Sequence, residues 1–132
     1  MTKMTKTIKT NNEQREVVIT IPERFPTANE YIDDNRRGYH VGARTKKTYT
    51  EIARIYTLKT PHMNGKCDVN FEWHVLSKAD PDNIDFARKF ILDGLQASGV
   101  LKGDSQKYIG KLSSTVVKDK NVYVRITLRE SE

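Results

Sequence analysis

The chain contains little cysteine and few apolar residues. Cys67 is the one cysteine among 132 residues, so no intramolecular disulfide can form. It lies among alternating apolar residues and is expected to be a small core residue rather than a catalytic one. Hydrophobic residues make up 36% of the chain, and no run of them is long enough to span a membrane. Together with a polar N-terminus that lacks a signal peptide, these absences predict a cytoplasmic protein without membrane contact.

Acidic residues are outnumbered by basic ones. Lys and Arg total 23, whereas Asp and Glu total 17, which gives a net charge of +6. This balance favours a polyanionic partner such as nucleic acid, although a merely soluble basic protein would show the same totals. Clustering distinguishes the two possibilities. The candidate nucleic-acid-binding side chains fall in one short stretch and around an acidic motif further along: Arg36, Arg37, Arg44, Lys46, Lys47, Lys78, Arg88 and Lys107.

The pattern of apolar residues predicts one small α+β domain. Residues 1–16 show no periodicity and are predicted to form a flexible basic tail, and residues 17–132 are predicted to form the domain. Its sheet is expected to be mixed or antiparallel, with about four strands and two to three helices. Alternation predicts strands at 17–21, 67–76, 108–117 and 122–128, and helical spacing predicts helices at 27–33, 45–58 and 83–98.

Turn residues and strand alternation give further predictions within these elements. Gly38 and Gly42 are expected to bracket a flexible basic loop. Residues 118–121 are expected to form the loop of a hairpin between the last two strands. On the 67–76 strand, Trp73 is expected to face the core, and His74 is expected to face solvent.

The acidic motif begins directly after that strand. Asp80 and Asp82 flank Pro81, which favours an extended backbone at Asp80. In that conformation both carboxylates point to the same side and form a hard oxygen site of the kind that Mg²⁺ accepts. A simpler interpretation is that one aspartate caps the following helix, with Pro81 at its first position. The two aspartates and their spacing leave both interpretations open.

Several segments together resemble the RusA family of Holliday-junction resolvases, over about residues 17–128. The family pattern combines an Asp-x-Asp-Asn, a helix with Lys-x-x-x-Asp-Ala-Leu, a Gly, and an Asp shortly before a strand. The segments that carry the resemblance are Asp80-Pro81-Asp82-Asn83, Lys89-Phe90-Ile91-Leu92-Asp93-Gly94-Leu95, Gly99-Val100-Leu101, Gly103-Asp104-Ser105-Gln106, Pro26-Thr27-Ala28-Asn29 and the helix at 49–55.

The resemblance implies a homodimeric, Mg²⁺-dependent endonuclease that resolves four-way DNA junctions by paired nicks in recombination and repair. By position, Asp80, Asp82 and Asp104 become the metal-binding carboxylates. Lys89 becomes the basic residue near the scissile phosphate. All four are thus the expected catalytic residues, with branched DNA and a second copy of the chain as partners.

This sequence departs from the family pattern in two places. Between Asn83 and Lys89 it has three extra residues, close to one helical turn. Counting forward from Asp82 without a gap instead puts Phe86 at the position of the Lys. Gly103 stands where family members often have another Asp, so the acidic pair there is reduced to Asp104. Reach is a further constraint, because the expected helix carries the chain away from Asp82. We therefore expect Asp104 to complete the site of the partner subunit or to arrive by ordering of its loop.

Other functions and roles are open at this point. A Mg²⁺ nuclease that cuts flaps or replication forks would have the same residues. A non-catalytic basic module that binds DNA or RNA would use its aspartates only as helix caps. Lys89 could instead form an i,i+4 ion pair with Asp85 or Asp93, both of which are expected to be surface charges.

Overall fold

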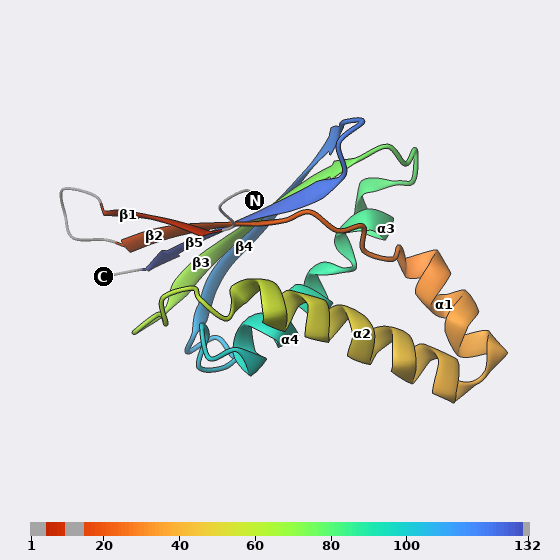
Figure 1. Cartoon of the computed structure of the whole chain (residues 1–132), viewed down its shortest axis with the longest axis horizontal. Helices are drawn as coiled ribbons and strands as arrows, with labels where there is room; N and C mark the ends of the chain where they lie inside the picture. The colour runs from red at the N-terminus through yellow and green to blue at the C-terminus, as the bar shows by residue number, and fades with distance from the viewer. Residues whose placement is uncertain (1–4, 10–14, 131–132) are drawn as a thin grey trace.

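The computed structural model describes residues 5–9 and 15–130. Within these residues a five-stranded sheet carries the helices on one of its faces (Figure 1). The elements are β1 (Thr5–Lys9), β2 (Arg15–Ile21), α1 (Ala28–Arg37), α2 (Tyr39–Thr57), β3 (Cys67–Val75), α3 (Pro81–Asp85), α4 (Arg88–Ala97), β4 (Ile109–Lys118) and β5 (Tyr123–Glu130). The prediction of a small α+β domain with a mixed sheet is confirmed.

The sheet order is β1-β2-β5-β3-β4, and β3 and β4 are its parallel pair. A parallel pair needs a crossover connection, which α3 and α4 provide. Because β3 lies between β4 and β5, the predicted hairpin between those two strands is wrong. The connection after β4 instead crosses the end of β3, where the Asp119 N–H donates to the Val75 carbonyl at 2.9 Å.

The N-terminal region contains a strand that periodicity did not predict. β1 pairs antiparallel with β2, and Thr7 lies opposite Val17. Residues 5–9 are therefore strand rather than flexible tail, and β1 adds a fifth strand to the four that were predicted. An edge strand is held mainly by backbone pairing, so its Thr- and Lys-rich sequence need not alternate. Residues 1–4 and 10–14 of the predicted tail lie outside the described residues.

The first helix begins as predicted, and the second begins earlier than predicted. Thr27 and Glu30 form a capping box, in which each side chain accepts a hydrogen bond from the other residue's N–H, at 3.3 and 2.9 Å. α2 starts at Tyr39, so the predicted flexible loop from Gly38 to Gly42 is mostly helix. Gly38 alone joins the two helices, with a φ of 145° that favours glycine.

Gly42 has a packing role instead of a flexible one. It is buried in α2 where that helix crosses α1. A Cβ at this position would lie 1.7 Å from the Asn35 side-chain oxygen of α1. The glycine therefore allows the close approach of the two helices.

The predicted helix over 83–98 is two helices. α3 ends at Asp85, α4 begins at Arg88, and the two residues between them form a turn. In that turn Phe86 packs against Tyr31 of α1 and against Phe90 of α4, at ring-centroid distances of 5.5 and 5.7 Å. Helical periodicity averages over both helices and cannot reveal a break of two residues.

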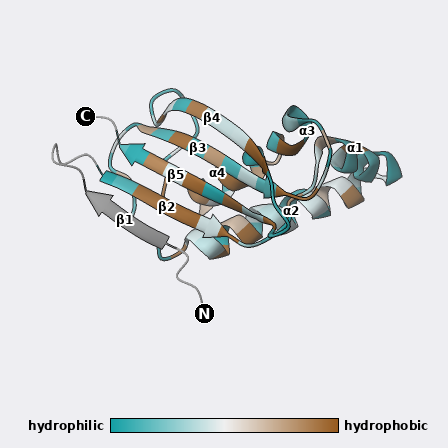
Figure 2. Cartoon of the chain, turned by 90° about the horizontal axis from the view of Figure 1, so that it is seen from above, coloured by the Kyte–Doolittle hydropathy of each residue, from teal (hydrophilic) through white to brown (hydrophobic). Residues whose placement is uncertain are grey.

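The hydrophobic core lies between the sheet and the helices. Figure 2 shows brown and teal residues alternating along the central strands. On β3, Cys67 and Trp73 are buried as predicted, and Trp73 is 3% exposed. Phe71 of the same strand is also buried. Burial raises the pKa of the Cys67 thiol to about 11, which agrees with a structural rather than a reactive cysteine.

Candidate functional site

The acidic motif forms the start of α3. Asp80 has an extended backbone (φ −62°, ψ 148°) and precedes Pro81 at the first helical turn, as predicted. Its carbonyl accepts hydrogen bonds from the N–H groups of Asn83 and Ile84, at 3.0 and 3.1 Å. Its carboxylate, however, forms no capping hydrogen bond. The cap interpretation therefore explains the backbone and the proline, but it leaves the Asp80 side chain without a structural role.

Asp82 lies in the first turn of the same helix. Both aspartates are exposed, and neither carboxylate hydrogen-bonds or pairs with a residue that the structure describes. Two uncommitted carboxylates separated by one residue are hard oxygen donors, which is the ligand chemistry that Mg²⁺ prefers. These two residues fit part of a Mg²⁺ site, with water and a substrate phosphate left to complete the coordination.

Asn83 connects the acidic motif to α1. Its side-chain oxygen accepts a hydrogen bond from the Asn29 N–H at 3.0 Å, across 54 positions of sequence. Asn29 ends the Pro26–Asn29 segment, whose Thr27 caps α1. Two segments that carry the family resemblance therefore meet in space, and α1 holds the start of α3 in place.

Asp85 is not the surface charge that was predicted. Its Oδ1 accepts hydrogen bonds from the indole N–H of Trp73, at 2.9 Å, and from the Ser114 hydroxyl. Its Oδ2 pairs with Arg88 at 3.2 Å, and its side chain is 19% exposed. The periodicity of one continuous helix concealed this role, because the break after Asp85 turns its carboxylate toward β3 and β4. Asp85 thus anchors the short helix that carries Asp82.

Of the two basic residues at the start of α4, one forms an ion pair within the protein and the other does not. Arg88 pairs with Asp85, so its guanidinium already has a partner within the protein. Lys89 is exposed and forms no ion pair with Asp85, Asp93 or any other described residue. The i,i+4 ion pair considered for Lys89 is therefore not formed, and its amino group is free to approach a ligand.

Asp104 lies far from the other two aspartates within one subunit. It precedes β4, whose start lies beside the start of β3, since the Cys67 N–H donates to the Tyr108 carbonyl at 2.9 Å. Asp80 and Asp82 instead follow the other end of β3, which at about 3.3 Å per residue is roughly 26 Å away. Figure 1 shows α3 and the segment after α4 at opposite ends of β3.

One subunit therefore does not assemble the predicted set of three metal-binding carboxylates. Among residues 15–130, no three His, Cys, Asp or Glu side chains lie together in a way that could hold a metal ion. The physical reason is the crossover, because α4 carries the chain back along the sheet before Asp104 is reached. Asp80 and Asp82 remain a pair at the start of α3. Lys89 follows them in the first turn of α4, after the two-residue turn that joins the helices.

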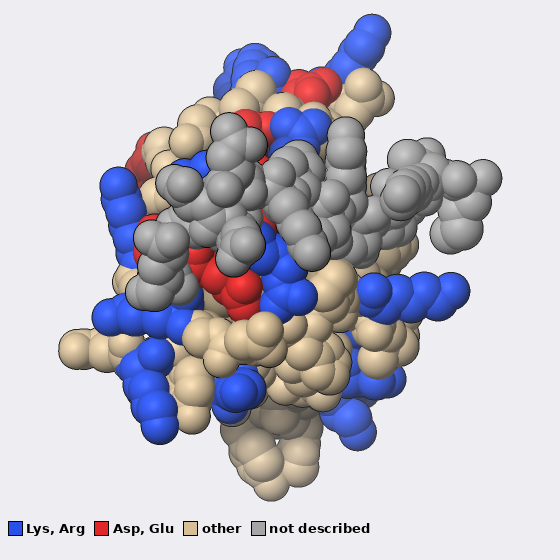
Figure 3. Space-filling view, turned by 90° about the vertical axis from the view of Figure 1, so that its left-hand side faces the viewer, with Lys and Arg blue, Asp and Glu red and all other residues tan. Residues whose placement is uncertain are grey.

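The predicted DNA-binding residues lie in separate parts of the fold. The end of the molecule where β2 begins and β5 ends mixes both charges, as Figure 3 shows, and includes an Arg15–Glu130 ion pair at 3.0 Å. The tip of the α1–α2 hairpin is different, since no Asp or Glu occurs between Asp34 and Glu51, although Arg36 pairs with Asp33 at 3.8 Å. The predicted residues are Arg36 and Arg37 on α1, Arg44, Lys46 and Lys47 on α2, Lys78 before α3, Arg88 on α4 and Lys107 before β4.

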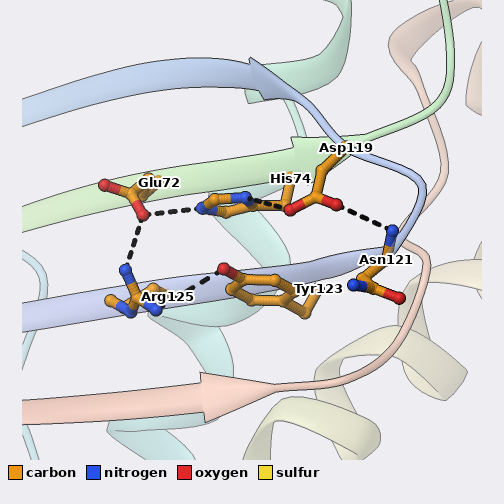
Figure 4. Close-up of polar contacts among 6 residues, drawn as sticks. All are labelled: Glu72, His74, Asp119, Asn121, Tyr123 and Arg125. Atoms are coloured by element: carbon orange, nitrogen blue, oxygen red, sulfur yellow. Dashed lines mark hydrogen bonds and ion pairs between the residues drawn. The ribbon is translucent and has the colours of Figure 1, made fainter.

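A polar cluster on the helix-free face of the sheet was missed. His74 is 8% exposed, so the prediction that it faces solvent is wrong. Its Nε2 lies 2.6 Å from Glu72, and its Nδ1 lies 3.0 Å from Asp119 (Figure 4). The His74 ring also stacks on Tyr123, with centroids 4.1 Å apart. Tyr123 and Asp119 cover the ring because β5 and the β4–β5 connection both pass beside β3.

This cluster is fully committed to internal contacts. Arg125 pairs with Glu72 at 2.8 Å. The Asn121 N–H donates to Asp119 at 2.9 Å, and this bond, followed by the His74 contact, lowers the pKa of the Asp119 carboxyl. The cluster therefore joins β3, β5 and the connection between β4 and β5. Alternation alone could predict that Glu72 and His74 lie on the same face of the strand. That Asp119 contacts His74 could be predicted only from the strand order.

Comparisons with known proteins add no assignment. No model of a known protein family matches the chain, and no curated protein matches it either. None of the described helices is both long and apolar enough to cross a membrane. The resemblance to RusA-type resolvases thus rests on the motifs quoted above.

Proposed function

We propose that this protein is a Mg²⁺-dependent endonuclease that acts on branched DNA, with four-way junctions as its substrate. The observation that carries the proposal is the pair of exposed, uncommitted carboxylates of Asp80 and Asp82 at the start of α3. A helix cap would engage one of them, and neither is engaged. The contact between Asn29 and Asn83 supports the proposal further, because it joins two segments of the resemblance at this point.

The residues around this point suit phosphodiester hydrolysis. Asp80 and Asp82 would hold Mg²⁺, which when bound supplies a Lewis acid for the phosphate and lowers the pKa of a coordinated water. Lys89 would place a positive charge beside the phosphate and stabilise the charge that develops on its oxygens. Asp85 keeps α3 fixed on β3 and β4 through Trp73 and Ser114, so the two aspartates stay in place during the reaction.

We further propose that Asp104 completes the site of a partner subunit in a homodimer. Asp104 lies at the opposite end of β3 from Asp80 in its own subunit, so a second copy is the direct way to bring them together. A twofold dimer would then hold two equivalent sites. Two such sites match the near-twofold symmetry of a four-way junction and lead to paired nicks.

The decisive experiment measures Mg²⁺-dependent cleavage of a mobile four-way junction, a flap and a linear duplex by the purified chain. Asp82→Asn should abolish cleavage. Asp68→Asn is the matched control, because it removes one charge elsewhere and keeps an oxygen that can accept the Lys111 N–H. Equal cleavage of flaps and junctions would assign a broader branched-DNA nuclease. No cleavage of any branched DNA would leave a non-catalytic DNA-binding module.

A mixing experiment tests the shared site. Asp80→Asn and Asp104→Asn subunits, each inactive alone, should form heterodimers with one complete site, and these should nick a junction once. Mixing Asp80→Asn with Asp82→Asn is the control, because each of its sites lacks one aspartate under either arrangement. If the first mixture is as inactive as the control, the shared-site arrangement is wrong.

A further inference from the structure

The tip of the α1–α2 hairpin is a sharp, projecting feature. Gly38 alone separates the end of α1 from the start of α2, and its φ is 145°. Figure 1 shows this tip extending away from the sheet, at the end of the molecule opposite the start of β2 and the end of β5. A single-residue connection gives the first residue of α2 a fixed and outward position.

Tyr39 occupies that position, and its ring is unusually accessible. The side chain is 74% exposed, more than any other large hydrophobic residue identified on the described surface. Its ring contact is with the adjacent His40, with centroids 3.9 Å apart and planes at 36°. The His40 ring lies on one side of Tyr39, so the pair presents an aromatic surface to solvent. A fixed, exposed ring of this kind is suited to stacking on a nucleobase.

The charges around Tyr39 indicate a polyanion as the partner. Five Lys and Arg residues and no acidic residue occur between Asp34 and Glu51. His40, Arg44 and Lys47 follow at helical spacing and therefore share one face of α2. Arg36 pairs with Asp33 of α1 at 3.8 Å. Arg44 and Lys47 are exposed and form no ion pair with any residue from 15 to 130.

We propose that Tyr39 stacks on an unpaired DNA base, while Arg44 and Lys47 contact the phosphates on either side of it. The inference deepens the proposed function, and it rests on that function only for the source of the unpaired base, which is the centre or end of a branched DNA. Stacking requires a free base face, so this contact distinguishes unpaired DNA from an intact duplex. Phosphate contacts alone would bind both forms.

The test compares binding to a labelled single-stranded oligonucleotide and to a duplex of the same length, in EDTA, by fluorescence anisotropy. Tyr39→Ala should weaken binding to the single strand by about tenfold and leave duplex binding within about twofold. Tyr39→Phe should bind like the wild type, because it keeps the ring. The dependence of affinity on salt should not change in either variant, since no charge is removed.

Lys47→Ala is the matched control on the same helix. It should weaken binding to both DNAs equally and reduce the salt slope by about one. Wild-type affinity in Tyr39→Ala, or an equal loss on duplex and single strand, would overturn the stacking role. If Tyr39 contributes to single-strand binding but no Mg²⁺-dependent cleavage occurs, the proposed nuclease activity is wrong and the stacking contact stands. If cleavage occurs but Tyr39 does not contribute to binding, the stacking contact is wrong and the nuclease activity stands.

Discussion

Replacing Asp85 tests whether its carboxylate anchors α3 to the sheet. The Trp73 indole N–H donates to Asp85 Oδ1 at 2.9 Å, and Trp73 is buried. In Asp85→Ala this donor remains buried without an acceptor. In Asp85→Asn the side-chain oxygen can still accept the bond, and only the ion pair with Arg88 is lost.

The expected losses follow from these contacts. An unsatisfied buried donor costs roughly 1–3 kcal/mol. The Arg88 pair is partly exposed and adds less than about 1 kcal/mol. Asp85→Ala should therefore lower the free energy of unfolding by about 2–3 kcal/mol, and Asp85→Asn by about 1 kcal/mol. Asp93→Ala in α4 makes no such contact and should stay within about 0.5 kcal/mol of the wild type.

Urea unfolding followed by tryptophan fluorescence provides the assay, because Trp73 is the one tryptophan of the chain and reports directly on this contact. The transition midpoints should shift without a change in slope. Equal midpoints for Asp85→Ala and Asp93→Ala would refute the anchoring role. Equal losses in Asp85→Ala and Asp85→Asn would show that the charge matters and the hydrogen bond to Trp73 does not.

Three further predictions concern other parts of the fold. Because burial raises the pKa of the Cys67 thiol to about 11, Ellman's reagent at pH 8 should label the unfolded chain rapidly and the native chain slowly; rapid native labelling would contradict this burial. Gly38→Ala should lower the free energy of unfolding by about 1–2 kcal/mol in thermal unfolding, because the φ of 145° strains a side-chain-bearing residue although the space around it is open. Gly65→Ala is the control, because Gly65 is equally open and has no positive φ, and it should leave the stability almost unchanged. The folded-state pKa of Asp119 lies below its ordinary value of 3.8, so its stabilisation is complete above that value and is lost as the pH falls through the folded-state pKa. Asp119→Asn should therefore be less stable than the wild type at neutral pH, with a difference that shrinks in acid; a difference independent of pH would show that the carboxylate charge is not responsible.

Local patterns in the sequence predicted the elements that local physics determines. The alternation from Cys67 to Val75 identified β3, and Thr27 with its helix marked the start of α1. The same patterns could not show the break between α3 and α4, because the apolar spacing continues across Phe86. They also could not show β1, whose polar sequence depends on its neighbour for pairing.

Strand order was the information that the sequence could not provide. Consecutive strands pair more often than not, and that tendency favoured a hairpin around residues 118–121. The insertion of β3 between β4 and β5 makes Asp119 cross the end of β3 instead. This single change buries His74 and brings it against Asp119, although neither residue carries a local signal of burial.

The same parallel pairing determines what the acidic residues can do. In a strand–helix–strand unit with parallel strands, a residue that follows the first strand lies at the carboxyl ends of the two strands. A residue that precedes the second strand lies at their amino ends, on the opposite side of the sheet's length. Asp80 follows β3, and Asp104 precedes β4, so no adjustment of side chains within one subunit joins them. A metal site that uses both aspartates therefore requires either a second copy of the chain or a rearrangement of the connection before β4. Because the mixing experiment gives a complete site only in the first case, it decides between an assembly and a local rearrangement.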